Sequence, residues 1–319
     1  MRSVSRHWWR FLAARIVGLI GVVVFLAFLT FFMVRLAPGD PAVYAAGLAG
    51  SSVHVAEIRH QLGLDTSVWH QLTHYLTDLV HFNFGKSYFY GQPVSTLLRQ
   101  ESGYSLELAG FGVGVVLVFA LPLGMLAAAF TQEGRHKRGE VAFVSVSSLV
   151  GSLPEYLTAT VLAFFFAVQL RFLPIAGAAG WKSLVLPVAA ISLRPTAILM
   201  RIVRVETLNV LAQDFMRTAR SKRLPARLLY LRHALPNVAT AALTIGGILF
   251  TGLIGGAVIV ENVFARPGLG TSLVSAVLNH DYPLIQGLAL ELGVIVVVVN
   301  MLVDVALAAI DPRSLTRQA

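Results

Sequence analysis

The chain has 319 residues, of which 56% are apolar and only 13% are charged, and its mean hydropathy is +0.73. Water-soluble domains carry about a quarter charged residues, so this composition excludes a soluble globule and predicts a protein of the lipid bilayer. The absence of cysteine excludes disulfides, thiolate metal sites, iron–sulfur clusters, a cysteine nucleophile and lipid-modified cysteines. The net charge of +9 does not indicate nucleic-acid binding here, because in a membrane protein the placement of positive charges matters more than their sum.

Six apolar runs have the length needed to cross the membrane, since a helix needs about 20 apolar residues to span the hydrocarbon core. They cover residues 16–34, 108–130, 141–168, 184–202, 238–260 and 288–310. The first run is longer than the core of about 7–15 residues that a secretory signal uses, and no small-residue cleavage site follows it. We therefore predict an all-α membrane protein with six transmembrane helices, the first of which is permanent.

Residues 37–103, between the first two runs, form a connection far longer than the usual link of about 2–8 residues between packed helices. It opens on a Pro-Gly-Asp-Pro turn. The pattern then predicts a helix over 53–61 and an aromatic-rich stretch over 68–84. We expect this segment to be a helical insertion with structure and a function of its own.

Two motifs within the insertion resemble ligand sites without meeting their requirements. Gly85-Lys86-Ser87 lacks the upstream glycine of a phosphate-binding loop, because that position is Val80. His70 and His74 have a metal-compatible spacing, but no cysteine and no third ligand stand in register. We therefore expect solvated histidines, and no metal site.

The connection between the fourth and fifth runs, residues 203–236, is strongly basic. The pattern predicts a helix over 215–224 capped by Asp214, and then a second helix that begins with Pro225 in its first turn. Such an elbow either lies against anionic lipid headgroups or serves as a helix that docks in a groove of a partner protein. In the second interpretation the apolar face has Phe215, Met216, Ala219 and Leu224, and the charged face has Arg217, Arg220 and Arg223.

Most lysines and arginines fall on one side when the six runs alternate across the membrane. The positively charged loops of a membrane protein stay in the cytoplasm, so both termini are predicted to be cytoplasmic and the insertion to be external. The chain divides accordingly into 1–36 (the cytoplasmic N-terminus and first helix), 37–103 (the external insertion) and 104–319 (a five-helix core with the basic loop).

Several motifs occur in a consistent order relative to these runs. They are RLAPGDP (35–41), QLGLD (61–65), FGKSY (84–88), SLEL (105–108), DFMRTARSK (214–222), LRHALPN (231–237), VENVF (260–264), PGLG (267–270), DYPLIQG (281–287), and Asn300 through Asp304 to Asp311-Pro312-Arg313. With them the sequence resembles, over nearly its whole length, the membrane subunit of a bacterial ABC importer, in the branch of dipeptide, oligopeptide and nickel permeases.

The resemblance implies that the elbow is the coupling loop, in which a short helix fits a cleft on a cytoplasmic ATPase subunit. Arg217-Thr218-Ala219 stands where the family has Glu-Ala-Ala, and Arg223 replaces the usual glycine. Arginine adopts left-handed backbone angles at a cost of about 1–2 kcal/mol, so either this turn is right-handed or the position is strained. The implied docking residues are Asp214, Phe215, Met216, Arg217, Thr218, Ala219, Arg220, Lys222 and Arg223.

The resemblance further implies an inner-membrane permease that is not itself an enzyme and has no cofactor, because ATP and Mg²⁺ are held by partner subunits. The partners would be two ATPase subunits or one fused pair, a homologous second permease, an external solute-binding protein and the lipid bilayer. Peptides are the expected substrate, and nickel, glutathione or another small solute is the alternative. An ion-coupled secondary carrier is the competing class, but it predicts inverted repeats, which the sequence does not show convincingly.

Glu155 and Arg194 lie inside the third and fourth runs, at similar depths of roughly 20 Å and 15 Å along their helices. Charges at such depths are costly unless they face protein or water. Pro154 and Pro195 stand next to them and free backbone carbonyls that Arg194 could bind. The alternatives are that each charge is satisfied separately, or that the two pair or flank the translocation path.

Overall fold

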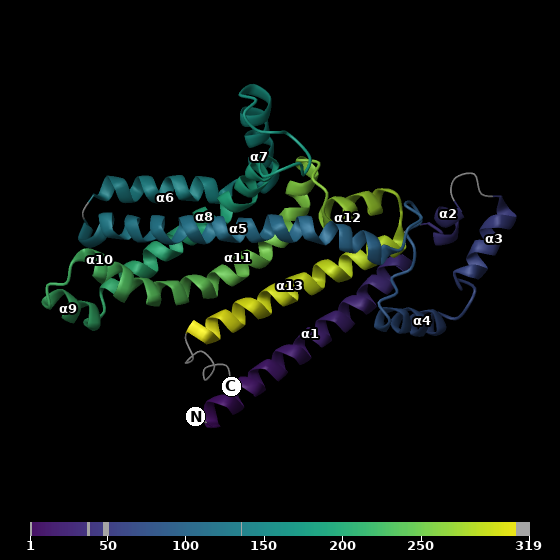
Figure 1. The fold of residues 1–319 in the computed structure, drawn as a ribbon, viewed down its shortest axis with the longest axis horizontal. Coiled ribbons are helices and arrows are strands. Elements are labelled where there is room, and N and C mark those ends of the chain that lie inside the picture. Colours follow the sequence, from purple (N-terminus) through teal and green to yellow (C-terminus); the bar gives the residue numbers. More distant parts are fainter. Residues whose placement is uncertain (1, 37–38, 47–50, 135, 311–319) are drawn as a thin grey trace. The chain divides into compact units, whose positions relative to one another are not determined.

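The computed structural model of the protein describes residues 2–36, 39–46, 51–134 and 136–310. Helices make up most of these ranges, and the β structure within them is one isolated bridge between Lys86 and Pro93. The helices are α1 (Arg2–Leu36), α2 (Pro41–Ala46), α3 (Ser52–Gln61), α4 (Val68–Val80), α5 (Val94–Thr131), α6 (Lys137–Ser152), α7 (Glu155–Leu162), α8 (Lys182–Leu211), α9 (Asp214–Ser221), α10 (Ala226–Leu228), α11 (Leu235–Val263), α12 (Leu269–Leu278) and α13 (Tyr282–Ile310) (Figure 1). A 3₁₀ turn (η1, Gln132–Gly134) and two π-helical segments (η2, Ala163–Gln169; η3, Leu229–Ala234) join them.

Five helices of the described chain are long and apolar enough to cross a membrane. Their candidate spans are Ala13–Leu36, Val94–Thr131, Lys182–Leu211, Gly246–Val263 and Tyr282–Val305. Each overlaps one of the six runs predicted from the sequence. The protein is therefore an all-α membrane protein, as predicted.

The third predicted run, 141–168, is not one helix. It is divided between α6 and α7–η2, which meet at an angle of 96°, and Figure 1 shows α7 turning away from α6. Pro154 causes the break, because proline has no N–H to donate and forces the residue before it out of the helical region. Leu153 has ψ 128° and Pro154 has ψ 144°, so the chain is extended for two residues before α7 begins. The count is thus five spans, or six if the bent pair is a single broken span.

Part of the charge pattern that predicts the orientation falls outside the described residues. Arg135, Arg313 and Arg317 lie there, as do residues 37–38 of the first motif and 311–313 of the last. The cytoplasmic placement of both termini and the division at 36/37 and 103/104 remain predictions.

The chain forms two compact units. Unit 1 consists of Met1–Leu106 and Arg266–Val298, and unit 2 consists of Glu107–Ala265 and Val299–Ala319. The buried core of unit 1 joins the start of α5 to α12 and α13, with Val94, Leu269 and Leu288 fully buried. Gly287 allows the close approach of α13 to α5, because a Cβ there would lie 2.6 Å from the side chain of Val94.

The insertion in unit 1 contains the predicted helix over 53–61, as α3. Ser51 begins it by accepting a hydrogen bond from the N–H of His54. Gly63 ends it: its φ of +64° lets the N–H of Leu64 reach back to the carbonyl of Arg59, at 3.0 Å. The aromatic-rich stretch 68–84 supplies α4, which ends at Val80.

Asp281, just before α13, joins two motifs that are distant in the sequence. Its fully buried carboxylate accepts hydrogen bonds from Ser87 Oγ and from the backbone N–H groups of Tyr88 (3.1 Å), Phe89 (3.2 Å) and Leu284 (3.4 Å). Burial, followed by the charge of Asp281, raises the pKa of Tyr88 to about 12. Through the hydrogen bonds of Asp281 to Ser87, Tyr88 and Phe89, the loop before α5 is held against the start of α13.

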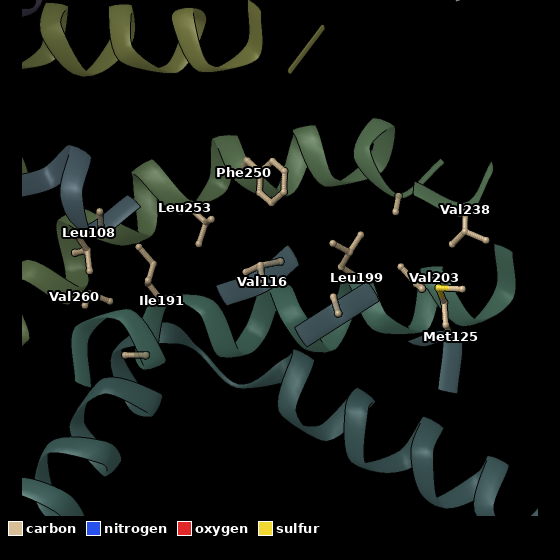
Figure 2. Close-up of a cluster of buried hydrophobic side chains, with 14 of the residues drawn as sticks. Leu108, Val116, Met125, Ile191, Leu199, Val203, Val238, Phe250, Leu253 and Val260 are labelled. Carbon is tan, nitrogen blue, oxygen red and sulfur yellow. The ribbon is translucent and has the colours of Figure 1, made fainter. Parts of the chain in front are cut away.

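Unit 2 is built around α8, which packs against α6, α7 and α11. Figure 2 shows its core, to which α5, α8 and α11 contribute Leu108, Val116, Met125, Ile191, Leu199, Val203, Val238, Phe250, Leu253 and Val260. Gly124 brings α5 close to α8, since a Cβ there would lie 2.6 Å from the carbonyl oxygen of Met200.

Candidate functional site

Glu155 and Arg194 meet at the break between α6 and α7. Arg194 Nη1 lies 3.5 Å from Glu155 Oε1, and Arg194 Nε donates to the carbonyl of Gly151 at 3.3 Å. The side chain of Arg194 is 47% exposed and that of Glu155 only 15%. Arg194 thus binds a carbonyl at the helix break and also pairs with Glu155, so the two charges are not satisfied separately. Their position beside the translocation path stays a prediction.

Gly256 of α11 makes room for the carboxylate. A Cβ at this position would lie 2.8 Å from Glu155 Oε2, so only glycine leaves the acid where it stands. One turn earlier, Gly252 has no such neighbour within 4 Å.

Two further arginines of α8 bind α6. Arg201 Nη1 donates to Ser148 Oγ at 2.8 Å, and the buried Arg204 donates to Glu140 Oε1 at 2.6 Å and to Thr131 Oγ1 of α5 at 3.0 Å. With Arg194 they form a line of arginines along one face of α8, antiparallel to α6.

Arg201 lies at the end of the predicted fourth run and Arg204 in the basic connection 203–236, and both belong to α8, which continues to Leu211. Charged residues interrupt an apolar run without interrupting a helix. Their spacing from Arg194, by seven and then three residues, was the signal that they share its face.

The predicted elbow helix is present as α9, with shifted ends. Asp214 is its first residue and not its cap; the N-cap is Gln213, whose side chain makes no capping hydrogen bond. Asp214 lies 3.5 Å from Arg217 Nη1, and a carboxylate in the first turn favours the helix dipole. The helix ends at Ser221, three residues before Leu224, because the chain turns there.

That turn is left-handed. Arg223 has φ +54°, so the position that resembles a family glycine keeps a glycine-like backbone with an arginine side chain. Pro225 then stands as the N-cap of α10, with ψ 147°. The alternative of a right-handed turn redirected by Pro225 alone is therefore wrong.

The apolar face predicted to dock with a partner is mostly covered by the chain itself. Met216 and Ala219 are buried in the core of unit 2, and Leu224 packs against it. Phe215 is 40% exposed, and Arg217 and the other charged residues of α9 are exposed. A partner can thus reach Phe215 and the arginines, but not Met216 or Ala219.

A second contact ties the elbow to the turn between α5 and α6. The Tyr230 hydroxyl in η3 donates to Gln132 Oε1 at 3.5 Å. Burial raises the pKa of Tyr230, opposed by the charge of Arg220. The elbow is therefore anchored on the same helix turn that Arg204 binds through Thr131.

Apolar spanning helices, one of them broken at a paired charge, and a solvated amphipathic helix anchored on their core define a helical membrane permease. The profile of the family "binding-protein-dependent transport system inner membrane component" matches residues 120–316, and the profile of the corresponding N-terminal region matches residues 8–98. The chain belongs to this family and is a multi-pass permease subunit of the bacterial inner membrane.

Curated relatives match it almost end to end. A putative peptide transport system permease of Brucella suis biovar 1 (strain 1330) is 36% identical, over 94% of this chain and 96% of its own. The glutathione transport system permease GsiC of Escherichia coli (strain K12) is 33% identical, over 93% and 96%. Among solved structures, an inward-facing MetNI methionine ABC transporter chain has a TM-score of 0.55 at 16% identity, covering 68% of this chain and 97% of that chain, and shows the fold alone.

Proposed function

We propose that this permease carries short peptides into the cell as half of the membrane path of an ATP-driven importer. Relatives of 33–36% identity are named as peptide and glutathione permeases, and glutathione is itself a tripeptide. The single observation that supports the choice is the pair of Arg194 and Glu155. A cation and an anion beside a helix break can receive the carboxylate and the ammonium group of a zwitterion.

The proposed complex contains this chain, a homologous second permease, two ATPase subunits that hold ATP and Mg²⁺, and an external solute-binding protein. We count α6, α7 and η2 as one broken span, which gives six spans with both termini in the cytoplasm. Residues 37–103 then lie outside, and the loop 203–236 lies inside.

The proposed coupling helix is α9. Its exposed Phe215, Arg217 and Arg220 would contact an ATPase subunit, while Met216 and Ala219 transmit the displacement to the core of unit 2. The left-handed turn at Arg223 presents a guanidinium to the partner's cleft.

The test is uptake by the reconstituted importer. Liposomes that hold both permeases and the ATPases are supplied with the binding protein, ATP, and labelled tripeptide, glutathione or Ni²⁺ in separate assays. ATP-dependent accumulation of the tripeptide, reduced in the Arg194→Met variant, supports the proposal. Accumulation of glutathione or Ni²⁺ alone would show that this solute, and not a peptide, is the substrate. Accumulation without ATP would show that the protein is a secondary carrier.

A further inference from the structure

Unit 1 contains a cavity of about 580 Å³ that neither the broken span nor the elbow uses. It is bounded by the end of α1, by α2 to α4, by the loop before α5 and by the start of α13. Its volume lies in the range of about 300–1,000 Å³ that is typical of small-molecule sites. Four of the motifs that carry the family resemblance, at 35–41, 61–65, 84–88 and 281–287, contribute to its lining.

Arg35 is oriented in this lining by neutral groups. Its guanidinium lies over the ring of Phe31, 5.2 Å from the centroid, and donates to the side-chain oxygen of Gln71. Gln71 is fixed in turn, since its amide donates to the carbonyls of Leu64 (3.2 Å) and Thr66 (2.9 Å). Across the described chain no carboxylate pairs with Arg35, so its charge is available to an anion.

Arg59, the other arginine of the lining, is paired with Asp40. Asp40 also accepts from the backbone N–H of Ala42 at the start of α2, at 3.0 Å, so this pair serves the structure of the insertion. Of the two arginines that line the cavity, Arg35 is therefore the one that no carboxylate of the described chain pairs with.

Asp78 has the complementary property. Its carboxylate accepts from Asn83 at 3.2 Å and lies 2.9 Å from His74 Nδ1, which is charged only when protonated. No lysine or arginine in the described ranges pairs with it. The cavity therefore has one arginine and one aspartate, Arg35 and Asp78, that no side chain of permanent opposite charge pairs with in the described ranges.

Gln71, which binds Arg35 of α1, lies on the same face of α4 as Asp78. Gln71, Tyr75 and Asp78 stand at positions i, i+4 and i+7 of α4, and all three line the cavity. At 1.5 Å per residue, Gln71 and Asp78 are about 10 Å apart along the axis. An extended peptide spans about 3.3–3.6 Å per residue, so three residues cover the same length.

We propose that this cavity binds a zwitterionic peptide of about three residues, with its carboxylate at Arg35 and its ammonium group at Asp78. Tyr75, whose hydroxyl is fixed 3.0 Å from Thr30 Oγ1, lies between the two ends and packs against the side chains of the peptide. This inference rests on the proposed function and adds a second peptide site, in unit 1, to the one in unit 2.

The experiment measures equilibrium binding to the complete importer in phosphatidylcholine nanodiscs, without binding protein and without nucleotide. The probes are labelled trialanine, its C-terminal amide and its N-acetyl derivative. Each modification should weaken binding to the wild type about tenfold, because it removes one charge-assisted contact.

Two variants assign the ends. Arg35→Gln should weaken binding of trialanine about tenfold and abolish the preference over the amide, while Asp78→Asn should abolish the preference over the N-acetyl derivative. Arg99→Gln and Asp65→Asn are the matched controls, since both are exposed residues of unit 1 that do not line the cavity. Both should bind all three probes as the wild type does.

The inference would be overturned if the wild type bound trialanine, its amide and its N-acetyl derivative equally well. It would also be overturned if Arg35→Gln and Asp78→Asn kept the wild-type preferences among the probes, or if Arg194→Met abolished binding. Competition by phosphatidylglycerol that disappears in Arg35→Gln would identify a lipid phosphate as the anion, and would also overturn it. The proposed function is judged separately by liposome uptake, which can succeed for peptides while cavity binding fails.

Discussion

Arg194 of α8 lies 3.5 Å from Glu155, at the point where Pro154 interrupts the helix that precedes α7. The arginine also binds the carbonyl of Gly151. One side chain therefore satisfies a backbone group freed by the break and compensates the charge of Glu155. The pair joins α8 to the bent segment, so a change in either charge acts on both.

Loss of either charge should impair transport without preventing insertion. Arg194 is half exposed, so we expect Arg194→Met and Glu155→Gln each to lower peptide uptake between about twofold and fivefold. The double variant should be less than additive, because both single changes remove one interaction. Uptake into liposomes at equal protein content measures this, and strictly additive losses would show that the two residues act separately.

Gly256→Ala should displace Glu155. The added methyl would lie 2.8 Å from the carboxylate, so the acid must shift from the position in which it pairs with Arg194. Gly252→Ala is the control, with nothing within 4 Å and the same gain of about 1 kcal/mol in helix propensity. We expect uptake to fall for Gly256→Ala alone; equal uptake by the two variants would contradict the role of Gly256.

Arg204→Met should lower the stability of unit 2. Arg204 is buried, but the side chain of Glu140 is 40% exposed, so water compensates part of the loss. We expect a decrease of about 1–2 kcal/mol in the free energy of unfolding, and a smaller one for Arg201→Met, whose partner is the neutral Ser148. Thermal unfolding of the purified importer distinguishes the two, and an equal effect would exclude a special contribution of Arg204.

Negative charge introduced on α9 should affect coupling at its exposed residues and folding at its buried ones. The double variant with Arg217→Glu and Arg220→Glu should insert normally, because both side chains face solvent. It should lose the stimulation of ATP hydrolysis by the binding protein. Ala219→Glu should reduce the amount of folded permease, because Ala219 is buried. Membrane protein yield and stimulated ATPase activity separate the two outcomes. Normal stimulation of ATP hydrolysis in the variant with both arginines replaced would show that α9 is not the coupling helix.

Hydropathy was sufficient to locate the spanning helices, because about 20 apolar residues have few other uses. It did not show the break at Pro154, since the run 141–168 is mostly apolar before and after the kink. The helix α9 could be predicted from its motif, but the motif does not show which of its apolar residues the chain itself covers. The contact of Asp281 with Ser87 and the cavity of unit 1 depend on segments far apart in the sequence, which no local pattern connects.

The carboxylate of Asp281 also imposes an order on biosynthesis. It is separated by 194 residues from Ser87, and the two segments of unit 1, Met1–Leu106 and Arg266–Val298, are separated in the sequence by Glu107–Ala265. At a synthesis rate of about 5–20 residues per second, the ribosome needs roughly 10–40 s to make the intervening chain. During that interval the loop near Ser87 lacks its buried anchor, so the insertion cannot be completed before Asp281 has been synthesised.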